Sequence, residues 1–376
     1  MPTALARQLA GLPPEVQERL RAHGFDAAAF CERAARVAAA GVDNVARGEI
    51  GPPAPSDVVP LPPRGSAEHA RLASVGAAAL ARGEHALVVL AGGMATRMGG
   101  VVKALVEALP GRTFLELRLA EQEAVRARHG RAAPLWLMTS DATDGPIRAA
   151  LGPRLDGERV AAFVQGLAPR LDERAGLFLG ADGAPSLHAP GHGDLPDALR
   201  ASGLLARFVA GGGRSVTLTN LDNLGATLEP AVIGWHLDQG ADVTCELVEK
   251  SGTDRGGIPV RWNGRPVVLE ELRLPPTLDA SSVRVFNTNT FHVGARALLE
   301  SHVDWTWLVV KKRVGERDAL QMERLIGELT CALPTRFLLV PRTGAESRFL
   351  PVKDSDELAV RRAEIEQVAR DRGMLA

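Results

Sequence analysis

Several residue types are scarce in this chain of 376 residues, and each scarcity excludes a class of protein. The three cysteines are widely spaced and form neither a disulfide framework nor a zinc-binding pattern. No apolar run approaches the ~20 residues of a membrane-spanning helix, and the N-terminus lacks a secretory apolar region. A net charge of −1 argues against general binding to nucleic acid or to an anionic membrane. We therefore expect a reduced, cytoplasmic enzyme or binding protein in which any anion site is local.

Lysine is also scarce, because only five of the 44 lysine and arginine residues are lysine. Arginine evidently serves at most solvated positions, so the remaining lysines are candidates for sites that need a compact ammonium group. Lys103 and Lys353 are the first candidates. Lys250 and Lys312 come second, while Lys311 fits a solvated position. The alternative is that a few lysines simply fall where chance puts them.

The chain divides into three parts by composition and periodicity. Residues 1–84 are predicted to be helical, with an extended connector that contains six prolines between residues 48 and 65. In residues 85–335, apolar strands alternate with segments of helical period, which predicts an α/β domain with a mixed, mostly parallel sheet. Residues 336–376 contribute Lys353 and a closing helix from about 355 to 371. The expected strands are 87–91, 134–140, 160–165, 215–220, 242–249 and 283–291, with an inserted hairpin that turns at Asn263-Gly264.

The stretch "VVLAGGMATRMGGVVK", residues 88–103, joins a buried strand to a glycine-rich loop. Its glycines leave the backbone N–H groups free to approach phosphate oxygens, while Arg97 and Lys103 add positive charge. The loop matches neither the Walker pattern nor the dinucleotide fingerprint, which would need glycine where Met94 stands. It predicts a nucleotide phosphate site, although a glycine-rich turn from strand to helix is the structural alternative.

Further polar motifs follow other predicted strands, at the edge where ligands bind in open α/β sheets. His192 lies between two glycines, which lets an imidazole contact a ligand; Asp194 is well placed to cap the following helix. Asn220, Asp222 and Asn223 end a strand and together indicate a magnesium and hydroxyl site, since one or two carboxylates together with substrate phosphates usually hold Mg²⁺. Simple turn chemistry is the alternative there.

Two more groups are candidates for recognition of sugar hydroxyls. Asn287 and Asn289 lie two residues apart in "FNTNTF", on one expected strand face. Glu270 ends the predicted hairpin and is an acceptor for a hydroxyl group, or only a carboxylate at the edge of the sheet.

Together these motifs resemble the UTP–glucose-1-phosphate uridylyltransferase family, also called UDP-glucose pyrophosphorylase, over residues 86–363. The most specific matches are "PGHGD" at 190–194, "NLDNLGA" at 220–226, "FNTN" at 286–289 and "RFLPVK" at 348–353. The stretch "LAGGMATRMG" is intermediate between this family and the related UDP-N-acetylhexosamine pyrophosphorylases. The resemblance implies a glycosyltransferase-A-like fold that joins UTP and glucose 1-phosphate with Mg²⁺, releasing pyrophosphate.

The resemblance also implies roles for single positions. Lys353 matches the family's catalytic lysine, with Lys103 and Arg97 at the pyrophosphate, and Asp222 matches the metal and phosphate position. The nucleotide-binding positions are Leu90, Ala91, Gly92, Gly93, Lys103, Met138, Gln165, Gly191 and Asp222. The sugar-phosphate positions are His192, Asn220, Glu270, Asn287, Asn289 and Lys250.

Some features depart from the family pattern. Ala95 replaces a loop glycine, Val102 replaces a proline, and Thr290 replaces an asparagine, which affects loop geometry and sugar selectivity more than the reaction. The family's C-terminal β-helix, used for oligomer contacts, has no counterpart, so we expect a monomer or a different dimer. The alternatives are a pyrophosphorylase for N-acetylglucosamine 1-phosphate or galactose 1-phosphate, and a sugar-nucleotide-binding protein without turnover. A nicotinamide-dependent dehydrogenase is remote, because the fingerprint is missing.

Overall fold

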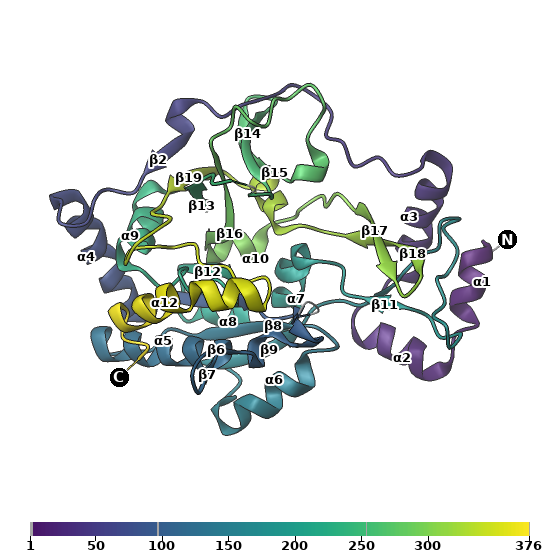
Figure 1. Ribbon diagram of the computed structural model, residues 1–376, viewed down its shortest axis with the longest axis horizontal. Helices are drawn as coiled ribbons and strands as arrows, with labels where there is room; N and C mark the ends of the chain where they lie inside the picture. The colour runs from purple at the N-terminus through teal and green to yellow at the C-terminus, as the bar shows by residue number, and fades with distance from the viewer. Residues whose placement is uncertain (1–2, 96–97, 253, 376) are drawn as a thin grey trace.

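An eight-stranded sheet runs through the centre of the protein in the order β2-β19-β13-β16-β12-β3-β8-β9 (Figure 1). The structure is a computed structural model that describes residues 3–95, 98–252 and 254–375. β16 runs antiparallel to both of its neighbours, whereas the other paired strands are parallel. The predicted α/β class with a mixed, mostly parallel sheet is therefore confirmed. The strands are β2 (Val58–Pro60), β3 (His85–Leu90), β8 (Leu135–Thr139), β9 (Val160–Val164), β12 (Ser215–Asn220), β13 (Val243–Glu249), β16 (Val285–Gly294) and β19 (Thr335–Leu339).

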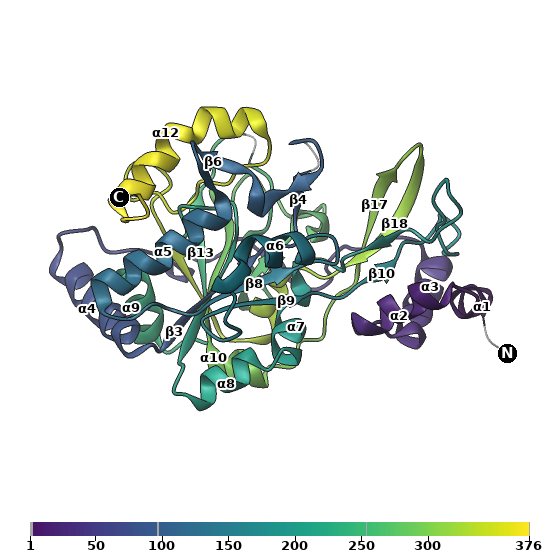
Figure 2. The same cartoon turned by 90° about the horizontal axis from the view of Figure 1, so that it is seen from below.

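Helices cover both faces of this sheet because side chains alternate along each central strand. In β3, Leu87 and Val89 pack into one core, and Ala86 and Val88 pack into another. Figure 2 shows α5 and α12 on one side and α7, α8 and α10 on the other. The helices on the first face are α5 (Phe114–His129), α6 (Asp144–Leu151) and α12 (Ser355–Asp371); those on the second are α7 (Leu195–Ala201), α8 (Leu204–Ala210) and α10 (Ala295–Glu300).

The N-terminal part contains more than helices. α1 (Ala4–Ala10), α2 (Pro14–Ala22) and α3 (Ala27–Ala40) form a helical group, and α4 (Ala67–Arg82) packs against α9 (Pro230–Gln239). Between them, the proline-rich connector supplies β1 (Ile50–Gly51) and β2, and β2 lies at the edge of the main sheet. An edge strand tolerates Pro60 because one side of it makes no ladder hydrogen bonds.

Several short hairpins complete the chain. β14 (Ile258–Trp262) and β15 (Arg265–Leu269) form the predicted hairpin, with left-handed backbone at Asn263 and Gly264 as a tight turn requires. Two short helices, α7 and α8, are separated at Gly203, whose φ is 73°. The other pairs are β4 (Met94–Ala95) with β5 (Val101–Val102), β6 (Glu107–Leu109) with β7 (Arg112–Thr113), β10 (Ala168–Pro169) with β11 (Leu187–His188), and β17 (Leu308–Val314) with β18 (Arg317–Glu323). Across the described ranges no helix combines the length and the apolar character needed to cross a membrane.

Candidate active site

A cleft of about 350 Å³ opens at the carboxyl ends of β3, β8, β9 and β12. This is the edge at which the strand-end motifs were expected to meet, and most of them do so. Eleven predicted residues line the cleft together with Ala189 and Leu221: Leu90, Ala91, Gly92, Gly93, Lys103, Met138, Gln165, Gly191, His192, Asn220 and Asp222. Their chemical roles remain predictions, but the tertiary structure places them around one space.

Hydrogen bonds from the turn between β8 and α6 fix the start of the glycine loop. The Ser140 hydroxyl donates to the Gly92 carbonyl (3.0 Å), and the Thr143 hydroxyl donates to the Ala91 carbonyl (3.1 Å). A Cβ on Gly92 would collide with the side-chain amide of Gln165, which explains why glycine stands there. Neither Ser140 nor Thr143 was a candidate, because a hydroxyl that holds a backbone carbonyl leaves no signal in one sequence.

The loop then forms the β4–β5 hairpin, so it is not a direct turn into a helix. Ala95 and Val102 both lie in this hairpin, and Lys103 follows it at the start of a 3₁₀ turn (Lys103–Leu105). Arg97, predicted to neutralise the leaving pyrophosphate, lies outside the described residues.

Lys103 and Asp222 form an ion pair at the cleft wall. The Lys103 Nζ donates to Asp222 Oδ2 at 2.7 Å, and the backbone N–H of Val352 donates to the same oxygen at 3.2 Å. Both side chains keep some exposure, 19% for Lys103 and 12% for Asp222. The carboxylate thus joins the glycine loop, the turn after β12 and the segment that carries Lys353.

The residues that could hold a metal are few. In the part of the chain that the structure describes, no group of three or more His, Cys, Asp or Glu side chains is placed to bind an ion. Asp222 is the carboxylate that lines the cleft, and hydrogen bonds are found at its Oδ2. This arrangement fits Mg²⁺, which is commonly held by one carboxylate together with substrate phosphates.

His192 is held as a neutral hydrogen-bond donor. The backbone N–H of Ile326 donates to its Nδ1 at 3.0 Å, so Nε2 carries the proton. Burial lowers the pKa of His192 to about 4. We expected the glycines on either side of His192 to let its imidazole contact a ligand. The structure shows that they allow close packing instead, because a Cβ on Gly191 or Gly193 would lie 2.5–2.6 Å from backbone atoms of Arg324.

Asp194 does not use its side chain as a helix cap, which corrects the simplest interpretation of this residue. Its Oδ2 accepts from the Gly166 N–H at 2.5 Å, and its Oδ1 pairs with Arg324. Gly166 follows Gln165 in the chain, and the Gln165 backbone N–H donates to the Thr139 carbonyl at 3.0 Å. The buried Asp194 carboxylate therefore positions the strand end that presents Gln165 to the cleft.

The two asparagines of "FNTN" have different hydrogen-bond partners and positions relative to the cleft. β16 contains both, and because it is antiparallel its beginning lies at the cleft edge. Asn289 has φ 59° next to a β-bulge, and its Nδ2 donates to Asn220 Oδ1 at 2.9 Å. Asn287 Oδ1 instead accepts from the Asn289 N–H (2.8 Å) and from the Cys245 thiol (3.3 Å). Asn289 reaches a residue that lines the cleft, whereas Asn287 supports it from behind.

Besides Asn287 and Asn289, three further predicted residues lie outside the cleft wall. The Lys250 Nζ donates to the Ala280 carbonyl at 2.9 Å. Glu270 packs beside Gly257 and Gly327, close to the segment that binds His192, and burial together with the charge of Glu328 raises the pKa of Glu270 to about 7. The Lys353 side chain is exposed, and within the described ranges its ammonium makes no hydrogen bond or ion pair.

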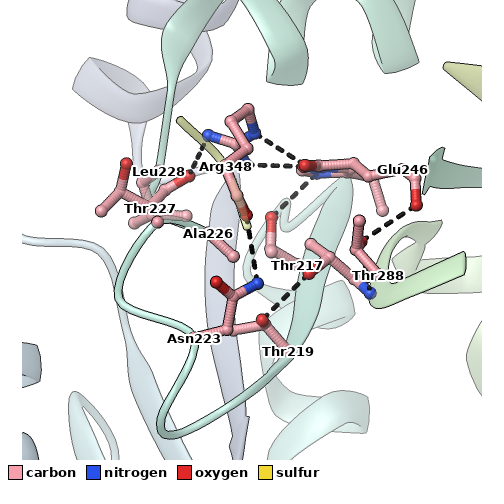
Figure 3. Close-up of polar contacts among 12 residues, drawn as sticks. Thr217, Thr219, Asn223, Ala226, Thr227, Leu228, Glu246, Thr288 and Arg348 are labelled. Carbon is pink, nitrogen blue, oxygen red and sulfur yellow. Dashed lines mark hydrogen bonds and ion pairs between the residues drawn. The ribbon is translucent and has the colours of Figure 1, made fainter. Parts of the chain in front are cut away.

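Behind the cleft lies a buried polar network that no sequence pattern indicated (Figure 3). Arg348 donates from Nε to Glu246 Oε2 at 2.7 Å and from Nη2 to Oε1 at 2.5 Å. Burial raises the pKa of Glu246, but the charge of Arg348 and hydrogen bonds from Arg348 and His292 bring it down to about 2. Asn223, first interpreted as part of a magnesium and hydroxyl site, donates to the Arg348 carbonyl (3.1 Å) and accepts from Leu350 N–H (2.8 Å). The network holds the segment before Lys353 against the turn after β12.

Comparisons with known proteins agree on one family. The family model described as UTP–glucose-1-phosphate uridylyltransferase matches residues 44–374. The enzyme of that name from Saccharomyces cerevisiae is 30% identical over 303 residues, which are 74% of this chain and 59% of the yeast protein. The one from Solanum tuberosum is 31% identical over 300 residues, 72% of this chain and 60% of the potato protein. The chain thus spans about three-fifths of the length of these curated relatives.

Solved structures share the fold. A UDP-glucose phosphorylase from Trypanosoma brucei superposes with a TM-score of 0.75 at 23% identity, covering 92% of this chain and 77% of that chain. A uridine diphosphate N-acetylglucosamine pyrophosphorylase from the same organism gives 0.70 at 22% identity, covering 84% and 72%. With the family model spanning residues 44–374, and with residues of the "PGHGD" and "NLDNLGA" motifs lining one cleft, the chain belongs to the UTP–glucose-1-phosphate uridylyltransferase family.

Proposed function

We propose that the protein transfers a uridylyl group from UTP to glucose 1-phosphate, giving UDP-glucose and pyrophosphate. The observation that supports this most directly is the Lys103–Asp222 pair beside a bare glycine backbone in a cleft of nucleotide-compatible size. A cation, a carboxylate and free N–H groups are what a triphosphate and its counter-ion need.

The nucleotide lies along the glycine loop in this proposal. The backbone of residues 90–93 approaches the phosphates and base, Met138 borders the uracil, and Gln165 reads the uracil edge. Gln165 is suited to recognising the base because it is buried, and because the hydrogen bond from Gly166 to Asp194 holds the end of β9 in place. Replacing a buried amide that recognises a base should lower discrimination between nucleotides.

The sugar phosphate approaches from the opposite wall. The Nε2–H of His192 donates to a phosphate or hydroxyl oxygen there, and the Asn220–Asn289 pair presents amide groups beside it. Asn287 holds Asn289 in its left-handed conformation. Glu270 and Lys250 contribute from further back, since neither lines the cleft.

The reaction needs no nucleophile from the protein. An oxygen of the sugar phosphate attacks the α-phosphorus of UTP in line, the new P–O bond forms, and the bond between the α-phosphorus and the bridging oxygen breaks. Pyrophosphate leaves with the electron pair. Catalysis of this kind rests on positioning and on charge stabilisation. Lys103 neutralises the departing pyrophosphate together with Arg97, and Lys353 stabilises the α-phosphoryl group and the incoming phosphate.

Mg²⁺ is the proposed cofactor, and Asp222 would hold it together with substrate phosphates. The ion, when bound, supplies positive charge that offsets the phosphate oxygens. In the described structure the hydrogen bonds from Lys103 and Val352 both reach Asp222 Oδ2, so Oδ1 would be the oxygen offered to the ion.

The deciding experiment measures pyrophosphate release from UTP with a panel of sugar 1-phosphates, each with Mg²⁺ and with EDTA. We expect turnover with glucose 1-phosphate that EDTA abolishes and that Asp222→Asn lowers strongly, while Asp238→Asn, at a residue of α9 that does not line the cleft, leaves it unchanged. Turnover only with N-acetylglucosamine 1-phosphate or galactose 1-phosphate would change the assigned sugar substrate and leave the proposed uridylyl transfer unchanged. UTP binding without turnover for any sugar would contradict the proposal and favour a sugar-nucleotide-binding protein.

A further inference from the structure

A second cavity, of about 880 Å³, lies between the N-terminal helices and the α/β domain. Residues of helices α2 and α3 line it from the N-terminal part, and residues of β9, α7 and β18 line it from the rest of the fold. It shares no lining residue with the cleft at the strand ends. Its volume falls in the range of small-molecule sites in proteins, about 300–1,000 Å³.

Two arginines meet in this cavity on one indole ring. The Arg33 guanidinium stacks on Trp307, with 4.0 Å between its Cζ and the ring centroid, and Arg324 lies 4.9 Å from the same centroid. Arg33 makes no hydrogen bond or ion pair with any residue that the structure describes, and its Nε is buried without a partner. The Nε of Arg324 is buried and unpartnered as well. Buried donors without acceptors are unusual in folded proteins.

The carboxylates in the cavity wall do not neutralise Arg33. Asp26 accepts from the Ala29 N–H at 2.9 Å as the cap of α3. Asp194 binds Gly166 and Arg324, as described above. Asp197 binds Arg200 and Arg324, each at 2.5 Å. None of the three carboxylates forms an ion pair with Arg33, although the charge of Asp26 still acts on it and partly offsets the lowering of its pKa by burial.

Burial lowers the pKa of Arg33, and burial together with the charge of Arg33 lowers the pKa of Arg324 to about 10. Arg324 already pairs with Asp194 and Asp197, whereas Arg33 brings a second positive charge to the same ring without an ion pair to any described residue, and an anion bound there would offset that charge. The wall also contains apolar and aromatic side chains, with Phe25, Phe30 and Phe163 among them.

We propose that this cavity binds a small organic anion, with an acidic group at Arg33 and Arg324 and an apolar body against Trp307 and the phenylalanines. The assignment rests on the geometry of the two arginines at Trp307, of which Arg33 has no ion-pair partner among the described residues, and on the apolar side chains that line the same cavity. A planar guanidinium that already stacks on an indole is well suited to bind a carboxylate, sulfonate or phosphate in its plane.

The bound anion also acts on the cleft through Arg324, an effect that rests on the proposed UTP site. The Arg324 N–H donates to the Pro190 carbonyl (2.7 Å), and its carbonyl accepts from Gly193 N–H (2.9 Å), so its backbone braces both sides of His192. Its side chain binds Asp194, which holds the residue after Gln165. An anion that draws the Arg324 side chain away from Asp194 changes the affinity for UTP, and by linkage UTP changes the affinity for the anion equally.

The test uses two fluorescent probes that differ in charge, 8-anilinonaphthalene-1-sulfonate and the uncharged N-phenyl-1-naphthylamine. Each is titrated into the whole protein, into Arg33→Met and into Arg36→Met, which removes an exposed arginine from the same helix. We expect the sulfonate to bind at least ~10-fold more tightly than the neutral probe, and Arg33→Met to remove that difference. Arg36→Met should bind as the parent does, and far-ultraviolet circular dichroism with thermal unfolding checks that both variants fold.

Equal binding of the two probes, or no effect of Arg33→Met, would overturn the anion site. Titration with UTP separates the two parts of the proposal. A shift of sulfonate affinity that reaches a plateau at high UTP supports coupling, whereas complete displacement would place the probe in the cleft and overturn the site. If UTP binds and the sulfonate affinity stays constant, the site stands and the coupling fails. If UTP does not bind at all, the proposed function and the coupling fail, while the two-probe comparison still decides the site.

Discussion

Asp222 shows how one residue can organise a site at the scale of single side chains. Its Oδ2 accepts from Lys103, 119 residues earlier, and from Val352 N–H, 130 residues later. The carboxylate thereby brings Lys353 to the same region as the glycine loop, although neither lysine is near the other in sequence. Because one of the donors is a mobile ammonium, the carboxylate can exchange a partner when a metal or a phosphate arrives.

Lys353→Ala is expected to lower kcat by about 10²–10³-fold, the usual loss for one preorganised charge. The free energy of unfolding should change by less than about 0.5 kcal/mol, because the side chain is exposed and makes no ion pair within the described ranges. Steady-state pyrophosphate release and urea unfolding measure both effects. Lys311→Ala, which removes an exposed lysine paired with Glu173 and Asp318, is the matched control. A kcat close to that of the parent protein would remove Lys353 from the mechanism.

Glu270 is expected to make stability depend on pH. Its folded-state pKa of about 7 lies above the ordinary value of 4.5, so the folded protein keeps this proton where the unfolded chain loses it. The free energy of unfolding therefore falls as pH rises from about 4.5 to 7, by up to about 3 kcal/mol, and is then constant.

Glu270→Gln removes this contribution, so the variant should gain stability relative to the parent as pH rises from 5 to 8. Urea unfolding at intervals across this range measures the difference. Glu271→Gln, at the exposed neighbouring position, should parallel the parent at every pH. A pH-independent difference for Glu270→Gln would mean that the carboxyl group titrates normally.

At the scale of elements, the crossing of α4 and α9 depends on two glycines. Gly76 of α4 lies against the backbone of Pro230, and Gly234 of α9 lies against the backbone of Leu72. A Cβ at either position would overlap a carbonyl group, so the helices approach closely only without side chains there. This contact matters to the cleft because α4 leads into β3 and α9 follows the turn that holds Asp222.

Gly76→Ala is therefore expected to destabilise the protein by about 1–3 kcal/mol or more, since the obstruction is backbone that cannot rotate away. The alanine's better helix propensity does not offset this overlap. Gly145→Ala in α6 is the control, because its Cβ meets nothing within 4 Å and should be neutral or stabilising. Equal unfolding midpoints in urea for the two variants would contradict the close packing of α4 on α9.

At the scale of the whole molecule, the N-terminal helices complete a core of their own. Leu9, Leu20 and Phe30 pack with Leu171 and with residues of β17 and β18 far along the chain. Asn44 adds two hydrogen bonds of 2.9 Å with the backbone of Val309. The helical group is thus a packed part of the fold, and it walls the second cavity.

Removal of residues 1–41 is expected to expose the partners of this core. The shortened protein should lose at least ~5 °C in Tm and self-associate, because Leu171, Leu320 and Met322 would face water. Differential scanning calorimetry and light scattering measure the two effects, with Val360→Ser, at an exposed site on α12, as a control for surface changes. A monomeric product with an unchanged Tm would show that the helices contribute nothing to the rest of the fold.

The alternation of apolar strands and amphipathic helices was enough to predict the α/β class, six central strands and the closing helix, because periodicity is a local property. Strand-end polar residues likewise predicted one shared edge, where Gly92, Gln165 and Asp222 now meet. β2, β19 and the β17–β18 hairpin were not predicted, since short strands carry little periodic signal and depend on distant partners.

What the sequence by itself determined is therefore the set of elements and the chemistry carried to one edge of the sheet. The tertiary structure alone decided which polar residues face the cleft and which hold the chain behind it. Asn287 and Asn289 are both asparagines of one motif, yet at the β-bulge Asn289 lies toward Asn220 and Asn287 lies toward Cys245. Arg348 pairs with Glu246, whereas Arg33 pairs with no residue that the structure describes. Local sequence predicts neither result, because both depend on which distant residues the fold places beside each arginine.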